Sequence, residues 1–174
     1  MIKTIPIIAL IVSALLFPSA ITAKTNHSRT KRPVQAQAPQ GTTGTFETKI
    51  ENFIRQSGYN FQKVQPNSWY LNLQGQELAQ IRIILGAGPG TIAMGAVVLP
   101  KRDVRINAKA LHELLKLSYD LNYVHVCIDT DDDLIVMSQK KEPWLTVEEF
   151  KTTVKQVSEA ADRAYAVMKP YLAP

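Results

Sequence analysis

Cysteine and histidine are scarce in this chain of 174 residues. It has one cysteine, Cys127, and three histidines, His27, His112 and His125. A single cysteine excludes an intramolecular disulfide framework and any zinc site built from several cysteines. The sequence also lacks a serine nucleophile elbow and the His-Glu-x-x-His pattern of zinc proteases. The familiar hydrolase signatures are therefore absent, and we expect no catalytic residues, no metal and no cofactor.

Acidic residues are missing from the N-terminal part of the chain. Residues 1–45 hold five Lys or Arg and no Asp or Glu, whereas residues 46–174 hold fifteen of each sign. The formal charge of +5 and the pI of about 9.3 therefore arise entirely in the first 45 residues. Without a basic stripe on the remaining 129 residues, which are neutral overall, nucleic-acid binding is not expected. The local basic cluster Lys101–Arg105 is interpreted as a solvated loop.

Residues 1–23 have the three zones of a secretory signal peptide. Lys3 supplies the positive charge, Ile5–Phe17 form the apolar run, and small residues precede a cleavage site expected after Ala23. The alternative is an uncleaved membrane anchor, because the run nearly reaches the roughly 17–25 residues of a transmembrane helix. We expect an exported protein, periplasmic or extracellular, with Lys24 as its first residue after cleavage.

Residues 24–45 differ in composition from the rest of the chain. They are rich in Thr, Gln, Pro and Gly, and they carry Lys24, Arg29, Lys31 and Arg32. Such a segment buries too little apolar area to offset the entropy of ordering it, so a flexible basic linker is predicted. At most, this arm is expected to make weak electrostatic contact with anionic envelope surfaces.

Residues 46–174 have the pattern of an α+β domain. Apolar spacing predicts a helix over 46–57 that stops at Gly58, and a helix over 107–121 with Asn107 as its N-cap. Runs of alternating or continuous apolar residues predict strands at 69–73, 79–85, 92–99, 124–128 and 134–138. With a last helix from Thr146, the order is α-β-β-β-α-β-β-α, which favours a mostly antiparallel five-stranded sheet with helices packed on it.

The last helix carries the clearest local signal. Thr146-Val147-Glu148-Glu149 is a capping-box sequence. Its apolar residues recur at spacings of four and three until Lys169-Pro170, and they are Phe150, Val154, Val157, Ala161, Ala164 and Met168. This stripe suits a coiled coil or a helix lying close on a sheet, and its alanines and short length favour the sheet.

Three segments resemble a known family. They are Leu114–Tyr123, the acidic hairpin turn that follows, and the helix start Leu145–Phe150. Together they resemble the YbjN-type bacterial family, whose fold is that of type III secretion chaperones, and the resemblance covers roughly residues 46–172. It implies a protein-binding or regulatory module without a catalytic centre.

Two segments, one rich in glycine and one rich in aspartate, share features with ligand-binding motifs. Gly86–Thr91 follows a strand as in dinucleotide-binding proteins, but the residues after it are β-type, so a glycine-rich hairpin is expected. Asp129–Asp133 offers four carboxylates, yet the sixth and twelfth positions of an EF-hand loop are Leu134 and Lys140. We interpret the aspartates as a hairpin turn. A weak calcium site at that loop is the alternative.

His125 and Cys127 lie two residues apart in a predicted strand, so their side chains share one face. Activation of a thiolate by this pair is not expected, because neighbours along a strand are poorly placed for proton transfer and no third orienting group is evident.

Strand alternation leaves one sheet face too apolar for plain exposure to solvent. Helices are expected on the face carrying Ile81, Ile83, Val126 and Val136. The other face carries the candidate partner-binding residues, beside Arg82: Tyr70, Val97, Tyr123, Cys127, Ile135 and Met137. Its cover is either the helix over 107–121, a second copy of the chain, or another protein. The function expected is non-catalytic protein binding in the cell envelope; the alternative is a small-ligand-binding protein or enzyme with an unrecognised pocket.

Overall fold

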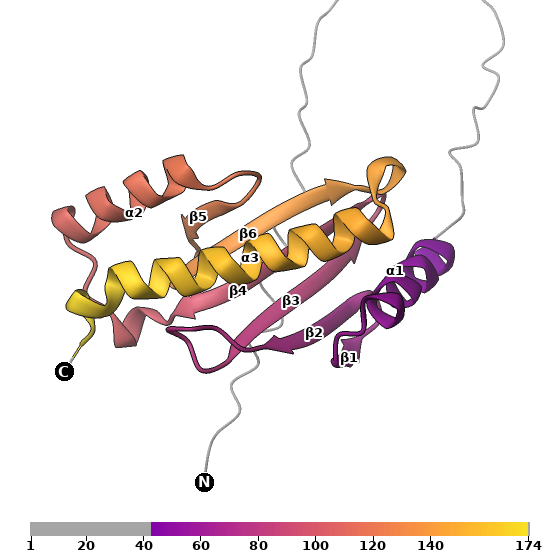
Figure 1. Cartoon of the computed structure of the whole chain (residues 1–174), viewed down its shortest axis with the longest axis horizontal. Helices are drawn as coiled ribbons and strands as arrows, with labels where there is room; N and C mark the ends of the chain where they lie inside the picture. Colours follow the sequence, from indigo (N-terminus) through magenta and orange to yellow (C-terminus); the bar gives the residue numbers. More distant parts are fainter. Residues whose placement is uncertain (1–42, 174) are drawn as a thin grey trace, which may run out of the picture. The chain divides into compact units, whose positions relative to one another are not determined.

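Helix α3 (Val147–Met168) lies across one face of a six-stranded antiparallel sheet (Figure 1). This computed structural model describes residues 43–173. The predicted signal peptide and all but the last three residues of the predicted linker lie outside the described residues. The elements follow one another in the predicted α+β manner, with one strand more than expected.

The strands lie in the order β1-β2-β3-β4-β6-β5. Their bounds are β1 Phe61–Gln65, β2 Ser68–Leu73, β3 Ile81–Gly88, β4 Thr91–Leu99, β5 His125–Ile128 and β6 Leu134–Lys141. Every neighbouring pair is antiparallel. The predicted glycine-rich hairpin is confirmed, because Gly88 pairs with Thr91 across a turn at Pro89 and Gly90.

The predicted count of five strands was wrong because β1 was missed. Its sequence, FQKVQ, contains only two apolar residues and pairs along one edge with β2. The turn to β2 needs a positive φ at Asn67, which has φ of 59°, and Asn is among the few residues that adopt this conformation readily. A short polar edge strand gives too few alternating apolar positions to be recognised.

Helix α3 forms as its sequence predicts. The Thr146 hydroxyl oxygen accepts a hydrogen bond from the backbone N–H of Glu149 at 3.1 Å, which satisfies one of the free donors of the first turn. All six residues of its apolar stripe are buried, and the helix packs mainly against β4. The alanines at 160, 161 and 164 let the helix approach the sheet closely, as the sequence indicated.

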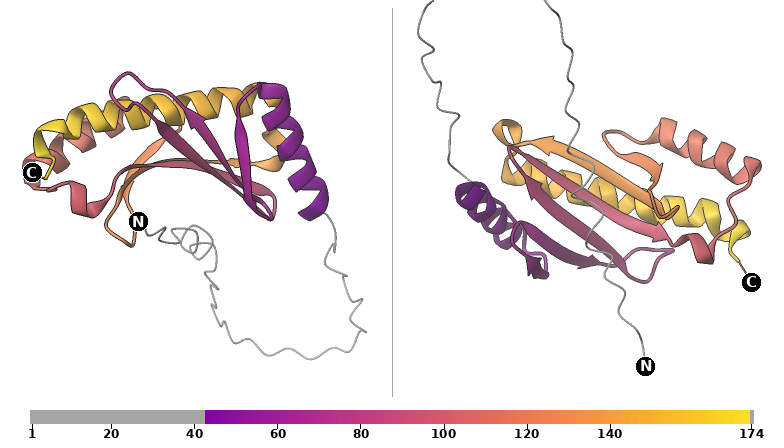
Figure 2. Two further views of the ribbon diagram at one scale, coloured as in Figure 1. Left: turned by 90° about the horizontal axis from the view of Figure 1, so that it is seen from below. Right: turned by 180° about the vertical axis from the view of Figure 1, so that it is seen from behind.

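The other two helices lie on the same side of the sheet as α3. Helix α1 (Thr43–Ser57) contacts α3 and β3, and it begins three residues earlier than predicted. Helix α2 (Ala108–Asp120) contacts α3 and β5, with the Asn107 side chain accepting from Ala110 N–H at 2.9 Å. The view from behind in Figure 2 shows the opposite sheet face with no helix across it. Cover of that face by α2, one of the expected alternatives, is therefore wrong.

One aspartate joins α3 to the loop between β2 and β3. Asp162 accepts hydrogen bonds from the backbone N–H groups of Gln76, Glu77 and Leu78 at 3.0, 2.9 and 2.8 Å. Partial burial alone would raise the pKa of Asp162, but the three N–H groups outweigh it and hold this pKa below its usual value. The loop is thereby fixed to the C-terminal half of the helix.

A buried hydroxyl in the core has no hydrogen-bond partner. Ser138 on β6 is 1% exposed, and its Oγ is unpaired within the described part of the chain. Replacing Ser138 by alanine is expected to raise the free energy of unfolding by about 1 kcal/mol, because it removes the desolvation cost of that group. Urea denaturation would measure this. Ser57→Ala is the matched control, expected to lower stability because the Ser57 hydroxyl donates to Ile54 C=O at 2.6 Å; no gain from Ser138→Ala would contradict the assignment.

Among the residues described, no helix has both the length and the apolar character needed to cross a bilayer.

Candidate partner-binding surface

The register of the sheet places five of the six predicted binding residues on one face. Tyr70 pairs with Ile84, Ile84 with Gly95, and Gly95 with Met137, which forms one row across four strands. In the next row Val97 pairs with Ile135, and Ile135 with Cys127. Directly paired residues of antiparallel strands point to the same side. We call this side, opposite α3, the open sheet face.

The centre of the open sheet face is apolar and only partly exposed. Tyr70, Val97, Cys127, Ile135 and Met137 are each half-buried, as is Ile84 between them. Their neighbours on the same strands are directed into the core: Leu71, Ala96, Leu134 and Val136 are buried on the helix side of the sheet. The two sides of the sheet thus differ in burial as the alternation predicted.

Tyr123 does not belong to this face. It lies in a bend before β5, has φ of 62° and is 73% exposed. Its ring lies 4.8 Å from the Lys140 ammonium, and Lys140 pairs with Ile92, a core residue on the helix side. The prediction failed because it continued the strand alternation back through a residue whose positive φ interrupts it.

Cys127 is on the open sheet face but is not an activated thiol. It is free and half-buried, and burial raises its pKa, which keeps the thiol protonated near neutral pH. His125 is exposed on the same face, as its position in the strand predicted. Within the described residues no hydrogen bond joins the two side chains.

Three carboxylates of the acidic loop between β5 and β6 contact the turn itself or Lys101. Asp129 accepts from the backbone N–H groups of Asp131 and Asp133, both at 2.9 Å. Asp133 accepts from Lys101 N–H at 2.8 Å, and Asp132 forms an ion pair with the Lys101 ammonium. No group of three or more metal-binding side chains is assembled in the part of the chain that is described. The geometry is that of a hairpin turn.

A second apolar surface was not recognised in the sequence. Leu111, Leu115 and Tyr119 on α2 are 45%, 63% and 91% exposed, and they recur every four residues. Their spacing places them on one stripe of the helix, which we call the α2 stripe. The sequence showed that α2 is rich in leucine, but only the packing shows that Leu114 and Leu117 are buried while Leu111 and Leu115 are not.

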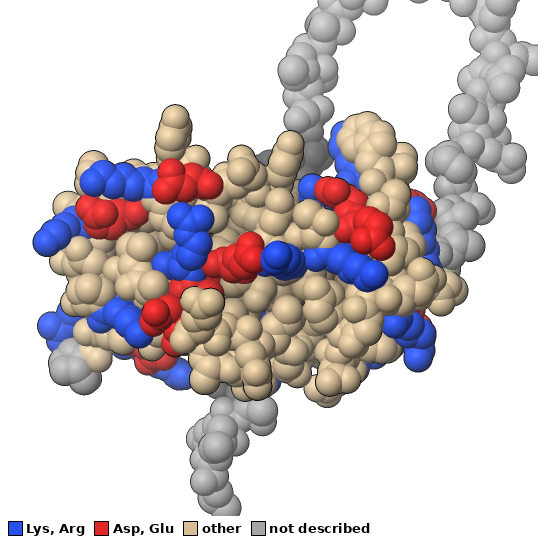
Figure 3. Space-filling model, in the orientation of Figure 1, with Lys and Arg blue, Asp and Glu red and all other residues tan. Residues whose placement is uncertain are grey.

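The helix side of the molecule has both charge signs mixed together (Figure 3). On α3, Lys151 pairs with Glu148 and Lys155 with Glu159, and Arg163 pairs with Asp120 of α2 at 3.6 Å. A hollow of about 580 Å³ lies beside α3. Each of its four charged lining residues, Asp120, Glu159, Asp162 and Arg163, has a partner within the described chain.

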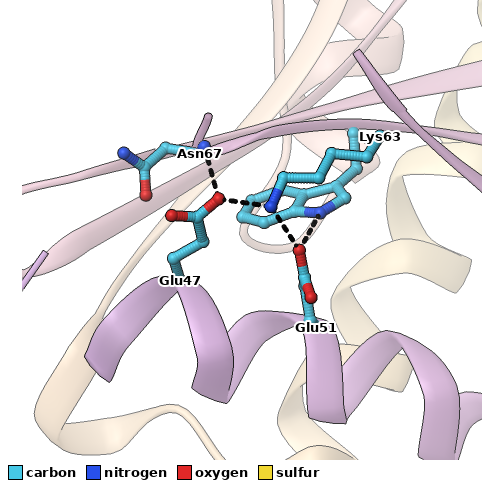
Figure 4. Close-up of polar contacts among 5 residues, drawn as sticks. Glu47, Glu51, Lys63 and Asn67 are labelled. Atoms are coloured by element: carbon cyan, nitrogen blue, oxygen red, sulfur yellow. Dashed lines mark hydrogen bonds and ion pairs between the residues drawn. The ribbon is translucent and has the colours of Figure 1, made fainter. Parts of the chain in front are cut away.

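Ion pairs hold α1 to the β1–β2 edge (Figure 4). The Lys63 ammonium lies 2.7 Å from both Glu47 Oε1 and Glu51 Oε1. Asn67 N–H donates to Glu47 at 3.2 Å, and the indole N–H of buried Trp69 donates to Glu51 at 3.4 Å. The Lys63 hydrogen bonds lower the pKa of both glutamates, and the glutamates raise the pKa of Lys63. This group is structural, since every member is satisfied within the chain.

Solved structures with the same architecture include a candidate regulator and chains from two protein complexes. YbjN from E. coli, described as a candidate transcription regulator, matches with a TM-score of 0.54 and 17% identity, over 76% of this chain and 98% of that one. The fold is therefore the YbjN-like, secretion-chaperone-like fold. A chain of the heterodimeric ExoU–SpcU complex from the type III secretion system of Pseudomonas aeruginosa matches with a TM-score of 0.52 and 14% identity. That match covers 70% of this chain and 98% of that one.

A chain of the ExsC–ExsE complex matches equally well, with a TM-score of 0.52 and 13% identity over 70% of this chain and 95% of that one. No family model matches the sequence, and a search of curated proteins finds no match. At these identities the similarity establishes the fold. These proteins are described as a candidate transcription regulator and as components of two protein complexes.

Proposed function

We propose that this chain is a non-catalytic protein-binding module of the bacterial cell envelope, and that the open sheet face receives its partner. The observation that carries the proposal is a sheet with three helices on one side and a half-buried apolar centre on the other, formed by Tyr70, Val97, Cys127, Ile135 and Met137. Two solved complexes with protein partners share this fold, which supports protein binding as its use here.

Export is part of the proposal and rests on the sequence of residues 1–23. The charged, apolar and small-residue zones support secretion with cleavage after Ala23. The mature protein is then expected to begin at Lys24, and to keep the basic arm that touches anionic surfaces weakly. Mass spectrometry of the protein purified from the envelope fraction tests this: a first residue other than Lys24 contradicts the cleavage site.

Affinity capture tests the binding function. The tagged protein and its Ile135→Asp/Met137→Asp variant are used to isolate partners from envelope extracts, followed by mass spectrometry. A stoichiometric protein that the variant fails to retain supports the proposal. A bound metabolite in place of a protein would support the competing class, a small-ligand-binding protein or enzyme.

The α2 stripe favours self-association as a second property. Two antiparallel copies of α2 related by a two-fold axis at Leu115 would place Leu111 opposite Tyr119 in both directions, so the stripe is complementary to itself. The helix carries Lys109, Lys116, Glu113 and Asp120, so two copies meet without net repulsion.

Leu115→Glu is the substitution that tests the homodimer. It places two glutamates at the two-fold axis and is expected to weaken self-association by about tenfold or more, because an unpaired charge is then desolvated. Analytical ultracentrifugation of the wild type and variant measures this. Leu115→Met, which keeps the apolar contact, is the control. A wild-type protein that stays monomeric at high concentration would contradict the homodimer.

A further inference from the structure

The charges of the sheet are all of one sign. The six strands contain four cationic residues, Lys63, Arg82, Lys140 and Lys141, and no Asp or Glu. The register divides these cations between the two faces. Lys63 pairs with Trp69, and Lys140 pairs with Ile92, so both point to the helix side, where Trp69 and Ile92 are buried. Arg82 and Lys141 occupy positions of the opposite parity, on the open sheet face.

On the helix side, each cation is neutralised by an acidic residue from the helix that covers it. Lys63 meets Glu47 and Glu51 of α1 (Figure 4), and Lys140 meets Glu149 of α3 at 2.5 Å. Both helices also bury apolar residues on the sheet, among them Ile50 of α1 and Val154 of α3. The sheet is thus covered by amphipathic helices that combine an apolar stripe with carboxylates.

On the open sheet face, the two cations have no acidic partner among residues 46–173. Arg82 is exposed, with its guanidinium 5.3 Å from the Tyr70 ring centre and its Nε 3.5 Å from Asn72 Oδ1. Lys141 is exposed, with its ammonium 5.6 Å from the Trp144 ring centre. Each charge is held at the surface by an aromatic ring, and a carboxylate can still approach it from solvent.

The apolar centre lies between the two cations. Arg82 is two residues before Ile84 and Lys141 is four residues after Met137, on opposite sides of the Ile84–Gly95–Met137 row. Six residues along the strands and two strand spacings across correspond to a separation of about 22 Å. A helix of about 15 residues, or an extended segment of about 7, spans this distance.

The chain's own N-terminal segment does not supply the missing carboxylates, because residues 1–45 contain no Asp or Glu. Resting on the proposed binding function of this face, we propose that its occupant is an acidic amphipathic segment of another protein. Its apolar residues lie on Val97, Ile135 and Met137, and Asp or Glu side chains near its two ends pair with Arg82 and Lys141. The partner then repeats on the open side what α1 and α3 do on the covered side.

A library of random linear peptides displayed on phage tests the proposed acidic occupant without knowledge of the natural partner. Peptides of about 16 residues are long enough to span the two cations in helical or extended form. Selection is run on the protein purified from cells expressing the full sequence. Ile135→Asp/Met137→Asp serves to subtract peptides that bind elsewhere. Arg82→Glu/Lys141→Glu is selected in parallel, and Lys109→Glu/Arg105→Glu reverses two exposed cations outside the sheet as the matched control.

The peptides retained only by an intact open sheet face are expected to carry Asp or Glu on both sides of an apolar centre. Their affinity, measured by fluorescence anisotropy, is expected to fall about tenfold on Arg82→Glu/Lys141→Glu and to weaken with added salt. The Lys109→Glu/Arg105→Glu control should leave it unchanged. Selection on the Arg82→Glu/Lys141→Glu variant should instead enrich peptides that contain Lys and Arg.

Peptides that need the intact open sheet face but show no excess of Asp or Glu would overturn this inference while leaving the binding function of the face in place. A selection with no face-dependent peptides would overturn both. Enrichment of sequences found in this chain itself would show that a second copy occupies the face, which also contradicts an acidic segment from another protein.

Discussion

Replacing both Ile135 and Met137 by aspartate is expected to abolish partner binding and to leave the helical content of the protein unchanged. Both side chains lie on the open sheet face and are half-buried, so the unbound protein keeps the new carboxylates hydrated. A partner covering them would have to desolvate two unpaired charges, which costs several kcal/mol. Circular dichroism and a binding titration with the captured partner would measure the two quantities separately.

The neighbouring residues of the same strand provide the matched control. Leu134 and Val136 are both fully buried beneath α3. Their replacement by aspartate is expected to unfold the domain, because the charge is then placed inside the core. If Ile135→Asp/Met137→Asp unfolded the protein in the same way, those two residues would be ordinary core and the open sheet face would not be a binding surface.

Replacing Asp162 by alanine is expected to lower the free energy of unfolding by about 2 to 3 kcal/mol. The substitution removes the acceptor of three backbone N–H groups in the β2–β3 loop, and hydrogen bonds to a charged group contribute more than neutral ones. Two of these N–H donors lie in an exposed part of the loop, so the loss is smaller than three fully buried bonds would give. Urea denaturation followed by circular dichroism measures it.

The contribution of Asp162 also depends on pH. Its pKa is lower in the folded protein than in the unfolded chain, so its stabilising effect is present above the unfolded pKa of about 4. The effect is lost as the pH falls below that value, through the folded pKa, because protonation removes the charged acceptor. Asp162→Asn should therefore differ most from the wild type near neutral pH and least in acid. An equal difference at every pH would contradict this role.

Gly75 gives an independent check on the same contact. A Cβ atom at this position would lie 2.2 Å from Asp162 Oδ1 and 2.8 Å from both the Leu78 carbonyl oxygen and Ile81 Cδ1, so Gly75→Ala is expected to displace the carboxylate and distort the loop. A Cβ at Gly58 would contact nothing, but its φ of 76° makes an alanine there strained for a different reason.

The parts of the fold predicted well from the sequence are those encoded locally. The capping residue Thr146 and the regular stripe of α3 lie within one segment, and the N-cap of α2 is a single side chain at Asn107. Strand alternation also placed Ile135 and Met137 on the correct face, because the side-chain period of a strand is fixed at two. These features need no information about distant residues.

The features that were missed depend on contacts between distant segments. The edge strand β1 is defined by its pairing with β2, and Tyr123 by a bend that interrupts the alternation. Helix α2 has leucines on more than one side, so its exposed stripe is visible only once Leu114 and Leu117 are seen to pack inward. The sheet register is needed to show that Lys63 and Lys140 lie on the helix side and Arg82 and Lys141 on the open sheet face. The packing of the helices is needed to show which of these cations have acidic partners.

Site-specific photocrosslinking in living cells tests most directly whether a protein partner binds the open sheet face. A photoreactive amino acid is placed at position 135 on that face, and at position 155 on the exposed side of α3 as the control. One protein adduct of defined mass is expected from position 135 and none from position 155. Adducts from position 155 alone, or no adduct from position 135 beside intact folded protein, would contradict partner binding at this face.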